Sequence, residues 1–323
     1  MTVKFEGRHI LSLRDFTREE MDYIFDVTAW MEPIAEKHTK LDILRDKILA
    51  TLFFQASTRT RLSFESAMQR LGGSVIGFAS PEASRSGDQY KETFGDTARV
   101  LNGYVDAVVM RHFQVGAPAD YASYSSVPMI NGGDGFGQDS EHPTQALIDM
   151  YTIKKLRGSI DGMKILIIGD GRFRTIHSYG FAFPKYKNIE AYLLVPEKAS
   201  ALKTVGNVDE DPWIPKKNEA EFKKLGFEFK RVRSIDEVLD KVDVIAVHGI
   251  AKDRTEKTPD MLRVTKEVVK RAKKDVIVLH PLPRLDELAE DVDNMPNAKY
   301  FMEAHVGVPI RMALLALVLG RVP

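Results

Sequence analysis

The chain has 323 residues, and 46 Lys and Arg balance 46 Asp and Glu, so its formal net charge of zero argues against a nucleic-acid-binding surface. Hydrophobic residues make up 44 %, as in ordinary globular proteins, and the absence of cysteine excludes disulfides, thiolate catalysis and cysteine-bound zinc. The first residues lack the apolar core of a signal peptide, and the longest apolar stretch, residues 312–319, is far shorter than the roughly 20 residues of a membrane span, so we expect a cytoplasmic protein with no membrane contact.

At roughly 100–200 residues per domain, the length predicts two domains. The first half mixes helical and strand patterns: Thr17 precedes an acidic helical turn, short apolar runs follow, and Gly72 ends a second helix. The predicted helices of this half span residues 17–35, 59–71 and 142–156, and its predicted strands span 48–54, 74–78, 107–110 and 127–131.

The second half alternates apolar strands with helices, a pattern that predicts a parallel sheet covered on both faces. Residues 205–221 are polar and contain prolines, and we predict a surface excursion there. The predicted strands span 163–168, 191–195, 227–232, 244–247 and 276–279, and the predicted helices span 234–242, 258–274 and 309–319.

The segment from Ser57 to Arg61 reads Ser-Thr-Arg-Thr-Arg and lies between a predicted buried strand and a helix start. Three hydroxyls, two guanidiniums and free helix N–H groups are the groups that bind a phosphate dianion. The alternative interpretation is a helix N-cap followed by a solvated basic turn, because short motifs also occur by chance.

Two further motifs lie at element ends. Arg111 and His112 end a predicted strand, and the carboxyl ends of parallel strands are where α/β proteins build their sites. His142 opens a helix with Pro143, and Gln145 lies three residues later on the same face, so both can donate to a carbonyl oxygen. Taken alone, these motifs are also interpretable as a strand-end arginine facing water and a capping histidine.

The last two motifs follow strands of the second half. The run from Gly169 to Arg174 partly matches a dinucleotide-binding fingerprint, but Arg174 replaces the third glycine and no acidic partner follows. We therefore interpret Arg174 as an anion ligand at a strand-to-helix turn. The run from His280 to Arg284 reads His-Pro-Leu-Pro-Arg, and its two prolines form a stiff turn that presents a backbone carbonyl.

Together these segments resemble the aspartate/ornithine carbamoyltransferase family, and its aspartate branch most, over essentially the whole chain. The motifs that carry the resemblance are, in chain order, FFQASTRTRLSFESAMQRLGG, VVMRH, HPTQALIDMYTI, HPLPRLDE and GVPIRMALLALVL. The resemblance implies an α/β fold with two doubly wound domains, each a central parallel sheet flanked by helices. It implies a carbamoyl-phosphate domain in residues 1–150 plus the helix 304–323, and an amino-acid domain in residues 151–303. It also implies a homotrimer with shared active sites, to which a regulatory chain is a possible addition.

The resemblance implies roles for individual residues in the carbamoyl-phosphate half. The Ser57 to Thr60 segment matches the phosphate cradle, Arg111 and His142 match the ligands of the carbamoyl oxygen, and Gln145 with the Leu282–Pro283 backbone matches the ligands of the carbamoyl amino group. The expected catalytic residues are Arg59, Thr60, Arg111 and His142. The expected carbamoyl-phosphate ligands are Ser57, Thr58, Arg59, Thr60, Arg111, His142, Gln145, Leu282 and Pro283.

The implied reaction needs only these donors. An uncharged amine attacks the carbamoyl carbon, negative charge develops on the carbonyl oxygen, and preorganised hydrogen-bond donors stabilise that charge. Phosphate leaves and accepts the proton of the amine. The resemblance therefore implies no metal, no cofactor and no general base from the protein, and domain closure would bring the two substrates together.

The acceptor half departs from the family pattern. Arg174 matches an arginine that binds the acceptor's carboxylate, but the arginine expected to bind its side-chain carboxylate is Gly249, and the nearby glutamine is Ala251. A glycine supplies no charged, bidentate ligand. His248, one residue before, is our candidate for a ligand that compensates in part or recognises another group of the acceptor. Lys91 is our candidate for the loop lysine of the family, although it is shifted by one position when the loop is aligned on its glutamate.

Two departures lie nearer the carbamoyl-phosphate motifs. Asp139, Ser140 and Glu141 are inserted before His142, and Phe113 replaces a proline after Arg111 and His112. Because carboxylates facing an anion site would be unfavourable, we expect the inserted ones to point away from it or to meet a cationic acceptor.

These observations give one leading hypothesis and two alternatives. The leading one is a carbamoyltransferase that carbamoylates L-aspartate to N-carbamoyl-L-aspartate and phosphate, a step of pyrimidine biosynthesis. The first alternative is a carbamoyltransferase for another amine, which Gly249 and Ala251 favour. The second is a catalytically silent regulatory paralogue that binds carbamoyl phosphate, which the displaced Lys91 favours. The nicotinamide-dependent dehydrogenase suggested by Gly169 is disfavoured because its glycine fingerprint is incomplete.

Overall fold

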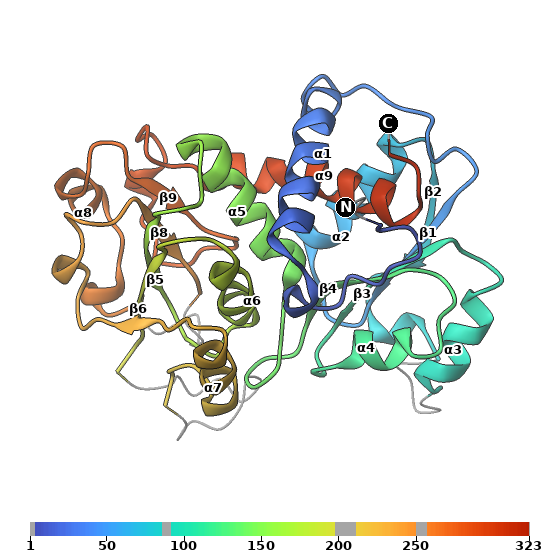
Figure 1. The fold of residues 1–323 in the computed structure, drawn as a ribbon, viewed down its shortest axis with the longest axis horizontal. Helices are drawn as coiled ribbons and strands as arrows, with labels where there is room; N and C mark the ends of the chain where they lie inside the picture. Colours follow the sequence, from blue (N-terminus) through green and yellow to red (C-terminus); the bar gives the residue numbers. More distant parts are fainter. Residues whose placement is uncertain (1–3, 86–91, 198–210, 250–256, 323) are drawn as a thin grey trace. The chain divides into compact units, whose positions relative to one another are not determined.

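A computed structural model describes residues 4–85, 92–197, 211–249 and 257–322 of the chain. Its backbone contacts divide the chain into two compact units. The first unit comprises Met1–Gly135, Ser140–Leu147 and His305–Pro323, and the second comprises Phe136–Asp139 and Ile148–Ala304. The helices α5 (Pro143–Arg157) and α9 (Tyr300–Val318) each begin in one unit and end in the other (Figure 1).

The sheet of the first unit is wholly parallel, with the strand order β2-β1-β3-β4. The chain leaves β1 toward β2 on one side and returns to pair β3 on the other side of β1. Ligands of open α/β sheets bind at this kind of switch point, outside the carboxyl ends of the strands. The strands are β1 (Ile48–Phe53), β2 (Ser74–Phe78), β3 (Ala107–His112) and β4 (Met129–Asp134).

Helices cover the first sheet. The helix α2 (Thr58–Arg70) packs on β1 and β2, and α4 (Ala117–Ala122) packs on β3, β4 and the preceding α3 (Phe94–Leu101). The helix α1 (Arg18–Glu36) begins at a capping box, in which Thr17 and Glu20 bond reciprocally to each other's backbone N–H groups. Its buried residues recur at helical spacing, which fixes the face turned to the core.

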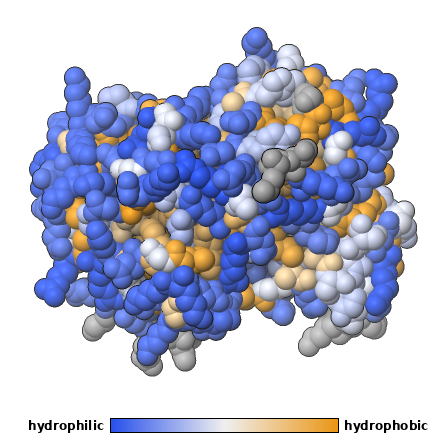
Figure 2. Space-filling view, viewed as in Figure 1, coloured by the Kyte–Doolittle hydropathy of each residue, from blue (hydrophilic) through white to orange (hydrophobic). Residues whose placement is uncertain are grey.

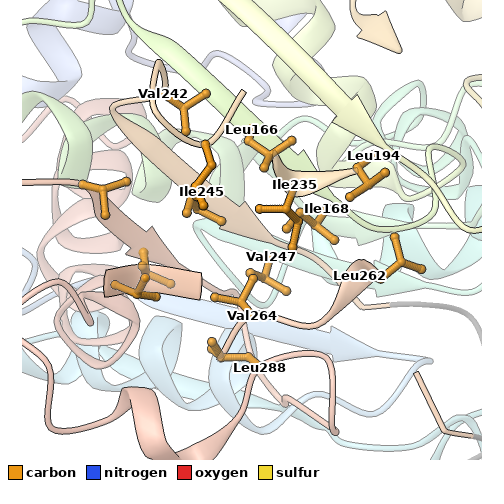
Figure 3. Close-up of a cluster of buried hydrophobic side chains, with 14 of the residues drawn as sticks. Leu166, Ile168, Leu194, Ile235, Val242, Ile245, Val247, Leu262, Val264 and Leu288 are labelled. Atoms are coloured by element: carbon orange, nitrogen blue, oxygen red, sulfur yellow. The ribbon is translucent and has the colours of Figure 1, made fainter. Parts of the chain in front are cut away.

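The second sheet is also wholly parallel, with the strand order β7-β6-β5-β8-β9 and its switch point between β5 and β8. Apolar side chains from several elements of this unit gather in one buried cluster, among them Leu166, Ile168, Ile245 and Val247 (Figure 3). The strands are β5 (Lys164–Ile168), β6 (Glu190–Leu194), β7 (Lys230–Arg231), β8 (Val244–Val247) and β9 (Ile277–Leu279). The helices are α6 (Arg174–Ala182), α7 (Lys216–Lys224) and α8 (Lys266–Arg271).

Two parallel sheets flanked by helices confirm the predicted α/β fold class. Several helix predictions were wrong in extent. Residues 234–242 contain only the short 3₁₀ turn Ile235–Glu237, and residues 258–274 contain a 3₁₀ turn, Asp260–Leu262, before α8. The helix predicted over 309–319 already begins at Tyr300. The prediction placed Pro309 at the first turn, but this proline lies inside α9. The polar residues 216–221, predicted as part of a surface excursion, belong to α7, which buries Phe222.

The helix α9 is long and apolar enough, by length and composition alone, to cross a membrane. However, 72 % of that stretch is buried inside the fold, as is usual for a core helix. Hydrophilic side chains cover most of the face seen in Figure 2, and apolar ones form smaller patches between them.

Candidate active site

The motif predicted to bind phosphate, Ser57 to Arg61, lies at the turn from β1 to α2 in the first unit. Ser57 is the N-cap of α2, and its Oγ accepts a hydrogen bond from the backbone N–H of Thr60 at 3.3 Å. Thr58 and Arg59 are exposed, whereas Thr60 is buried. The N-cap interpretation is confirmed. The phosphate-binding interpretation stays a prediction, with which the exposed Arg59 beside a helix N-terminus is consistent.

Arg111 lies at the carboxyl end of β3, directly beside that turn. Its carbonyl oxygen accepts hydrogen bonds from the backbone N–H groups of Phe54 and Gln55, at 2.9 and 3.3 Å. Its guanidinium is half-buried, and Nη1 donates to the carbonyl of Gly132 at 3.2 Å and lies 3.3 Å from Nε2 of His142. Since a guanidinium only donates, Nε2 of His142 is the acceptor in this contact.

His142, which is buried, directly precedes α5, and Gln145 in the first turn of that helix is half-buried. Oγ1 of Thr144 lies 3.4 Å from Nδ1 of His142, so both ring nitrogens face a polar group. The backbone N–H of Gln145 donates to the carbonyl of His142 at 3.1 Å. The first unit thus gathers Arg111 and His142 within hydrogen-bond distance at the same sheet edge as the Ser57 turn.

Gly133 is a member of this site that was not predicted from the sequence. It has a φ of +107°, and a Cβ atom there would lie 3.0 Å from Cδ2 of His142 and 3.1 Å from Nη1 of Arg111. Its backbone N–H donates to Oδ1 of Asn131 at 2.8 Å, which holds the turn in place. Glycine is the residue that permits both the left-handed backbone and the close approach. The double glycine after an apolar run was the signal for this turn.

The inserted carboxylates point to partners outside this cluster. Oδ2 of Asp139 lies 2.6 Å from Nζ of Lys217 in the second unit, to which both residues belong. Glu141 is buried in the first unit, where its carboxylate accepts hydrogen bonds from the Ser12 hydroxyl and, at 3.3 Å, from the backbone N–H of Leu13. Both carboxylates thus bond to residues other than Arg111 and His142, in agreement with the expectation that they turn away from the anion site.

In the second unit, the turn after β5 holds a buried ion pair. Arg172 donates to Oδ1 of Asp170 through Nε at 2.9 Å and to Oδ2 through Nη2 at 2.6 Å. The next arginine, Arg174, is half-buried and is the first residue of α6. A Cβ atom added at Gly249, after β8, would have Cζ of Phe173, at 3.7 Å, as its nearest contact among the described residues. Gly249 therefore lies next to the Arg174 turn, where the described residues leave room for a Cβ atom.

The His280 turn follows β9. The ring of His280 is buried, with Nε2 2.9 Å from Oε1 of Glu287, and its Nδ1 accepts a hydrogen bond from the backbone N–H of Leu282 at 2.8 Å. Burial alone would raise the pKa of Glu287, but hydrogen bonds from His280 and from backbone N–H groups lower it overall. The Leu282–Pro283 peptide is cis, Leu282 is half-buried and Pro283 is exposed.

His248, directly after β8, is held by two residues that were also not predicted from the sequence. Its Nε2 lies 3.4 Å from the hydroxyl of Tyr179, and that hydroxyl donates to Asp149. All three residues are buried in the second unit. An acidic residue among the apolar residues of α5 was the only signal of this network in the sequence.

The second sheet thus brings the turns of Arg174, His248 and Leu282 to neighbouring carboxyl strand ends. Two positions with expected roles, Lys91 and Ala251, lie outside the described residues. Within the described part of the chain, no group of three or more His, Asp or Glu side chains is arranged to hold a metal ion.

Two family models match almost the whole chain. The model of the aspartate/ornithine carbamoyltransferase carbamoyl-P binding domain matches residues 8–155, and that of the Asp/Orn binding domain matches residues 161–318. These matches cover the two halves that contain the motifs described above.

Curated relatives match along their full length. The aspartate carbamoyltransferase catalytic subunit of Methanobrevibacter smithii is 42 % identical, over 99 % of this chain and 97 % of its own. That of Archaeoglobus fulgidus is 43 % identical, over 97 % of this chain and 99 % of its own.

Solved structures agree. Aspartate transcarbamoylase from Trypanosoma cruzi in complex with carbamoyl phosphate and aspartate has a TM-score of 0.83 and 32 % identity, covering 98 % of this chain and 96 % of that chain. The catalytic subunit of M. Jannaschii aspartate transcarbamoylase has a TM-score of 0.81 and 39 % identity, covering 95 % of this chain and 96 % of that chain.

Proposed function

This chain belongs to the aspartate/ornithine carbamoyltransferase family, and we propose on that basis that it transfers the carbamoyl group of carbamoyl phosphate to the amino group of L-aspartate. The products are N-carbamoyl-L-aspartate and phosphate. The observation that carries the proposal is the contact between Arg111 and His142 beside the N-terminus of α2, within the carbamoyl-phosphate half of the family.

The residues of the first unit supply the donors that the reaction needs. As the amine nitrogen attacks the carbamoyl carbon, the carbon–nitrogen bond forms and charge moves to the carbonyl oxygen. We assign Arg111 and His142 to that oxygen, which in the proposed complex replaces the contact between them, so that His142 donates in its Nε2–H form. We assign the Ser57 to Thr60 turn, with its exposed Arg59, to the phosphate. The bond to the phosphate oxygen then breaks, and the leaving phosphate takes the proton of the amine. Each such preorganised donor contributes about 2.7–4 kcal/mol to the transition state.

Aspartate as the acceptor rests on the relatives, whose names are those of aspartate carbamoyltransferases. In this chain, Arg174 at the start of α6 is our ligand for an acceptor carboxylate. His248 is our second acceptor ligand, and Lys91 is a third that lies outside the described residues. The backbone of Leu282 and Pro283, with Gln145, is assigned to the carbamoyl amino group.

An acceptor other than aspartate is a specific alternative, because Gly249 offers no side chain where the family pattern has an arginine. An acceptor without a second carboxylate would not need that arginine. A screen therefore has to include asparagine and β-alanine beside aspartate.

We infer further that the protein works in the cytoplasm as a homotrimer with shared active sites, serves pyrimidine biosynthesis, and is able to bind a regulatory chain. The family membership supports the role in pyrimidine biosynthesis, and the homotrimer and the regulatory chain are proposed from the resemblance in the sequence. Light scattering of the purified protein should give three times the mass of the chain. Mixing inactive Lys91→Ala and His142→Ala subunits should restore activity if sites are shared, and should restore none if each subunit is self-sufficient.

The test of the proposed function is an assay of the purified protein with carbamoyl phosphate and aspartate. Formation of N-carbamoyl-L-aspartate, detected by mass spectrometry, is the predicted result. No ureido product from any amine, while carbamoyl phosphate still raises the melting temperature, would instead identify a silent paralogue.

A further inference from the structure

Asp149, Tyr179 and His248 form a buried hydrogen-bonded triad beside the carboxyl edge of the second sheet. Their exposed fractions are 1, 1 and 3 %, and they come from α5, α6 and the end of β8. Buried polar groups cost free energy unless they are paired, and an apolar core would serve folding as well. The triad is therefore a candidate for a role beyond packing.

The direction in which the Tyr179 hydroxyl donates determines which ring nitrogen of His248 carries the proton. A tyrosine hydroxyl carries one hydrogen, and here it donates to the carboxylate of Asp149, the stronger acceptor. The tyrosine oxygen then accepts from His248, whose Nε2 lies 3.4 Å away. Nε2 must therefore carry the ring proton.

Burial keeps the triad in this state. It lowers the pKa of His248 to about 3, with a smaller contribution from the charge of His280, so that the ring is neutral near pH 7. Burial, and then Asp149, raise the pKa of Tyr179 well above 10, so that the hydroxyl keeps its proton. A neutral ring that is protonated on Nε2 has a lone pair on Nδ1. Among the described residues, no hydrogen bond of the structure involves that atom.

The triad is joined to the elements that surround the switch point of the second sheet. The backbone N–H of His248 donates to the carbonyl of Ile168, at the end of β5, at 2.7 Å. Tyr179 lies on α6, the helix that begins with Arg174. The next residue after His248, Gly249, faces Phe173. His248 thus stands where open α/β sheets bind ligands.

We infer that Tyr179 and Asp149 are positioning residues that fix His248 in its Nε2–H form, so that Nδ1 accepts a hydrogen bond from the amino group of the bound acceptor. This inference rests on the proposed function, because it places the acceptor at this sheet edge. It names the chemistry that His248 recognises, which is an N–H donor and not a carboxylate, because a lone pair repels a carboxylate oxygen. Such a contact orients the amine, whose own lone pair must face the carbamoyl carbon.

The first test is the nitrogen spectrum of the full-length protein labelled with ¹⁵N-histidine. The signals of His248 are identified by their loss in His248→Gln, and we expect an unprotonated Nδ1 and a protonated Nε2 from pH 6 to 8. Tyr179→Phe should convert this pattern to a mixture of both neutral forms. The variant keeps the ring that stacks on Phe183 with centroids 4.9 Å apart, so the fold should persist. A protonated Nδ1 in the wild type, or an unchanged spectrum in Tyr179→Phe, would overturn the inference.

The second test separates positioning from a general structural effect. Tyr179→Phe should raise the KM for aspartate about 3- to 10-fold, which is the effect of losing one hydrogen bond. The KM for carbamoyl phosphate should stay unchanged. The matched control is Tyr192→Phe, which removes another tyrosine hydroxyl that donates to a carboxylate of the same unit, Glu190, at 2.8 Å. That control should match the wild type in both KM values.

An unchanged aspartate KM in Tyr179→Phe, or an equal rise of both KM values, would contradict the positioning role. If the wild type makes no N-carbamoyl-L-aspartate at all, the proposed function fails on that result. The nitrogen spectrum decides separately whether the triad sets the form of His248, since it requires no turnover.

Discussion

Nη1 of Arg111 lies 3.3 Å from Nε2 of His142, although 31 residues separate the two along the chain. The contact joins the end of β3 to the start of α5 inside the first unit. It shows that two motifs recognised separately in the sequence belong to one cluster. The same guanidinium is anchored to the carbonyl of Gly132, so its direction is fixed before substrate binds.

Replacing Arg111 by lysine tests that anchored guanidinium. Arg111→Lys keeps the charge but loses the planar fork, whose fixed geometry bonds the Gly132 carbonyl while other N–H groups face the substrate oxygen. We predict a fall in kcat of roughly 10²–10³-fold, as for loss of an oxyanion donor. Initial rates with saturating substrates measure it. The control Arg45→Lys changes an exposed arginine and should leave kcat unchanged, and a wild-type rate in Arg111→Lys would remove this residue from the catalytic set.

Gly133→Ala tests whether the cluster needs its close backbone approach. The added Cβ would lie 3.0 Å from the His142 ring and demand a left-handed backbone, which costs an alanine about 1–2 kcal/mol. We expect that loss of stability together with a large fall in kcat, measured by urea unfolding and by initial rates. Gly116→Ala is the control, because Gly116 also has a positive φ but no described atom within 4 Å of the added Cβ. It should lose stability and keep its kcat.

Gly249→Arg tests the missing carboxylate ligand. The described residues admit a Cβ atom there, since it would contact among them only Phe173, at 3.7 Å. If aspartate is the acceptor, the new charged hydrogen bonds, worth about 1.5–3 kcal/mol, should lower its KM by roughly 10- to 100-fold, alone or with Ala251→Gln. Gly249→Leu adds bulk without charge and should not lower it. Loss of turnover of some other amine in Gly249→Arg would show that the pocket is built for that amine.

Two buried histidines predict how stability depends on pH. Burial lowers the pKa of His112 to about 4 and that of His248 to about 3, below the value of about 6.5 expected in the unfolded chain. As the pH falls through 6.5, the unfolded chain therefore takes up protons that the folded chain does not, and unfolding becomes easier. Above that pH both rings are neutral in both states and add no slope.

Each histidine should contribute a slope of up to about 1.4 kcal/mol per pH unit between pH 6 and 5. Urea unfolding at pH 7, 6 and 5 measures the combined effect on the free energy of unfolding. His112→Gln should reduce the slope by up to about 1.4 kcal/mol per pH unit, because the proton uptake of one ring on unfolding is removed. An identical slope in this variant would show that the pKa of His112 is not lowered by folding.

The fold was largely predictable from the sequence because the spacing of apolar residues along a segment indicates which side chains are buried. The run Ile48–Phe53 is buried from its second residue onward, as its apolar residues predicted. The segment 234–242 misled for an instructive reason: Ile235, Val238, Leu239 and Val242 have helical spacing and are all buried, but the backbone there forms a 3₁₀ turn. Spacing predicts which side chains face the core, and it does not by itself fix the backbone that places them.

The site was predictable where one segment carries several functional groups. Ser57 to Thr60 and His142 to Gln145 are such segments. Gly133, Tyr179 and Asp149 were missed because each acts through a residue that is distant in the sequence. Tyr179 and His248 are 69 positions apart in the sequence. They meet only because β8, which precedes His248, lies beside β5, which precedes the helix of Tyr179.

The proposed aspartate carbamoylation is tested most directly by competition for a single carbamoyl donor. Purified protein is given ¹³C-carbamoyl phosphate with equimolar aspartate, asparagine, ornithine, β-alanine and diaminopropionate, and mass spectrometry identifies the labelled ureido products. We predict N-carbamoyl-L-aspartate as the dominant product, and its loss in Arg111→Lys. A different dominant ureido product, or none, would contradict the proposed function.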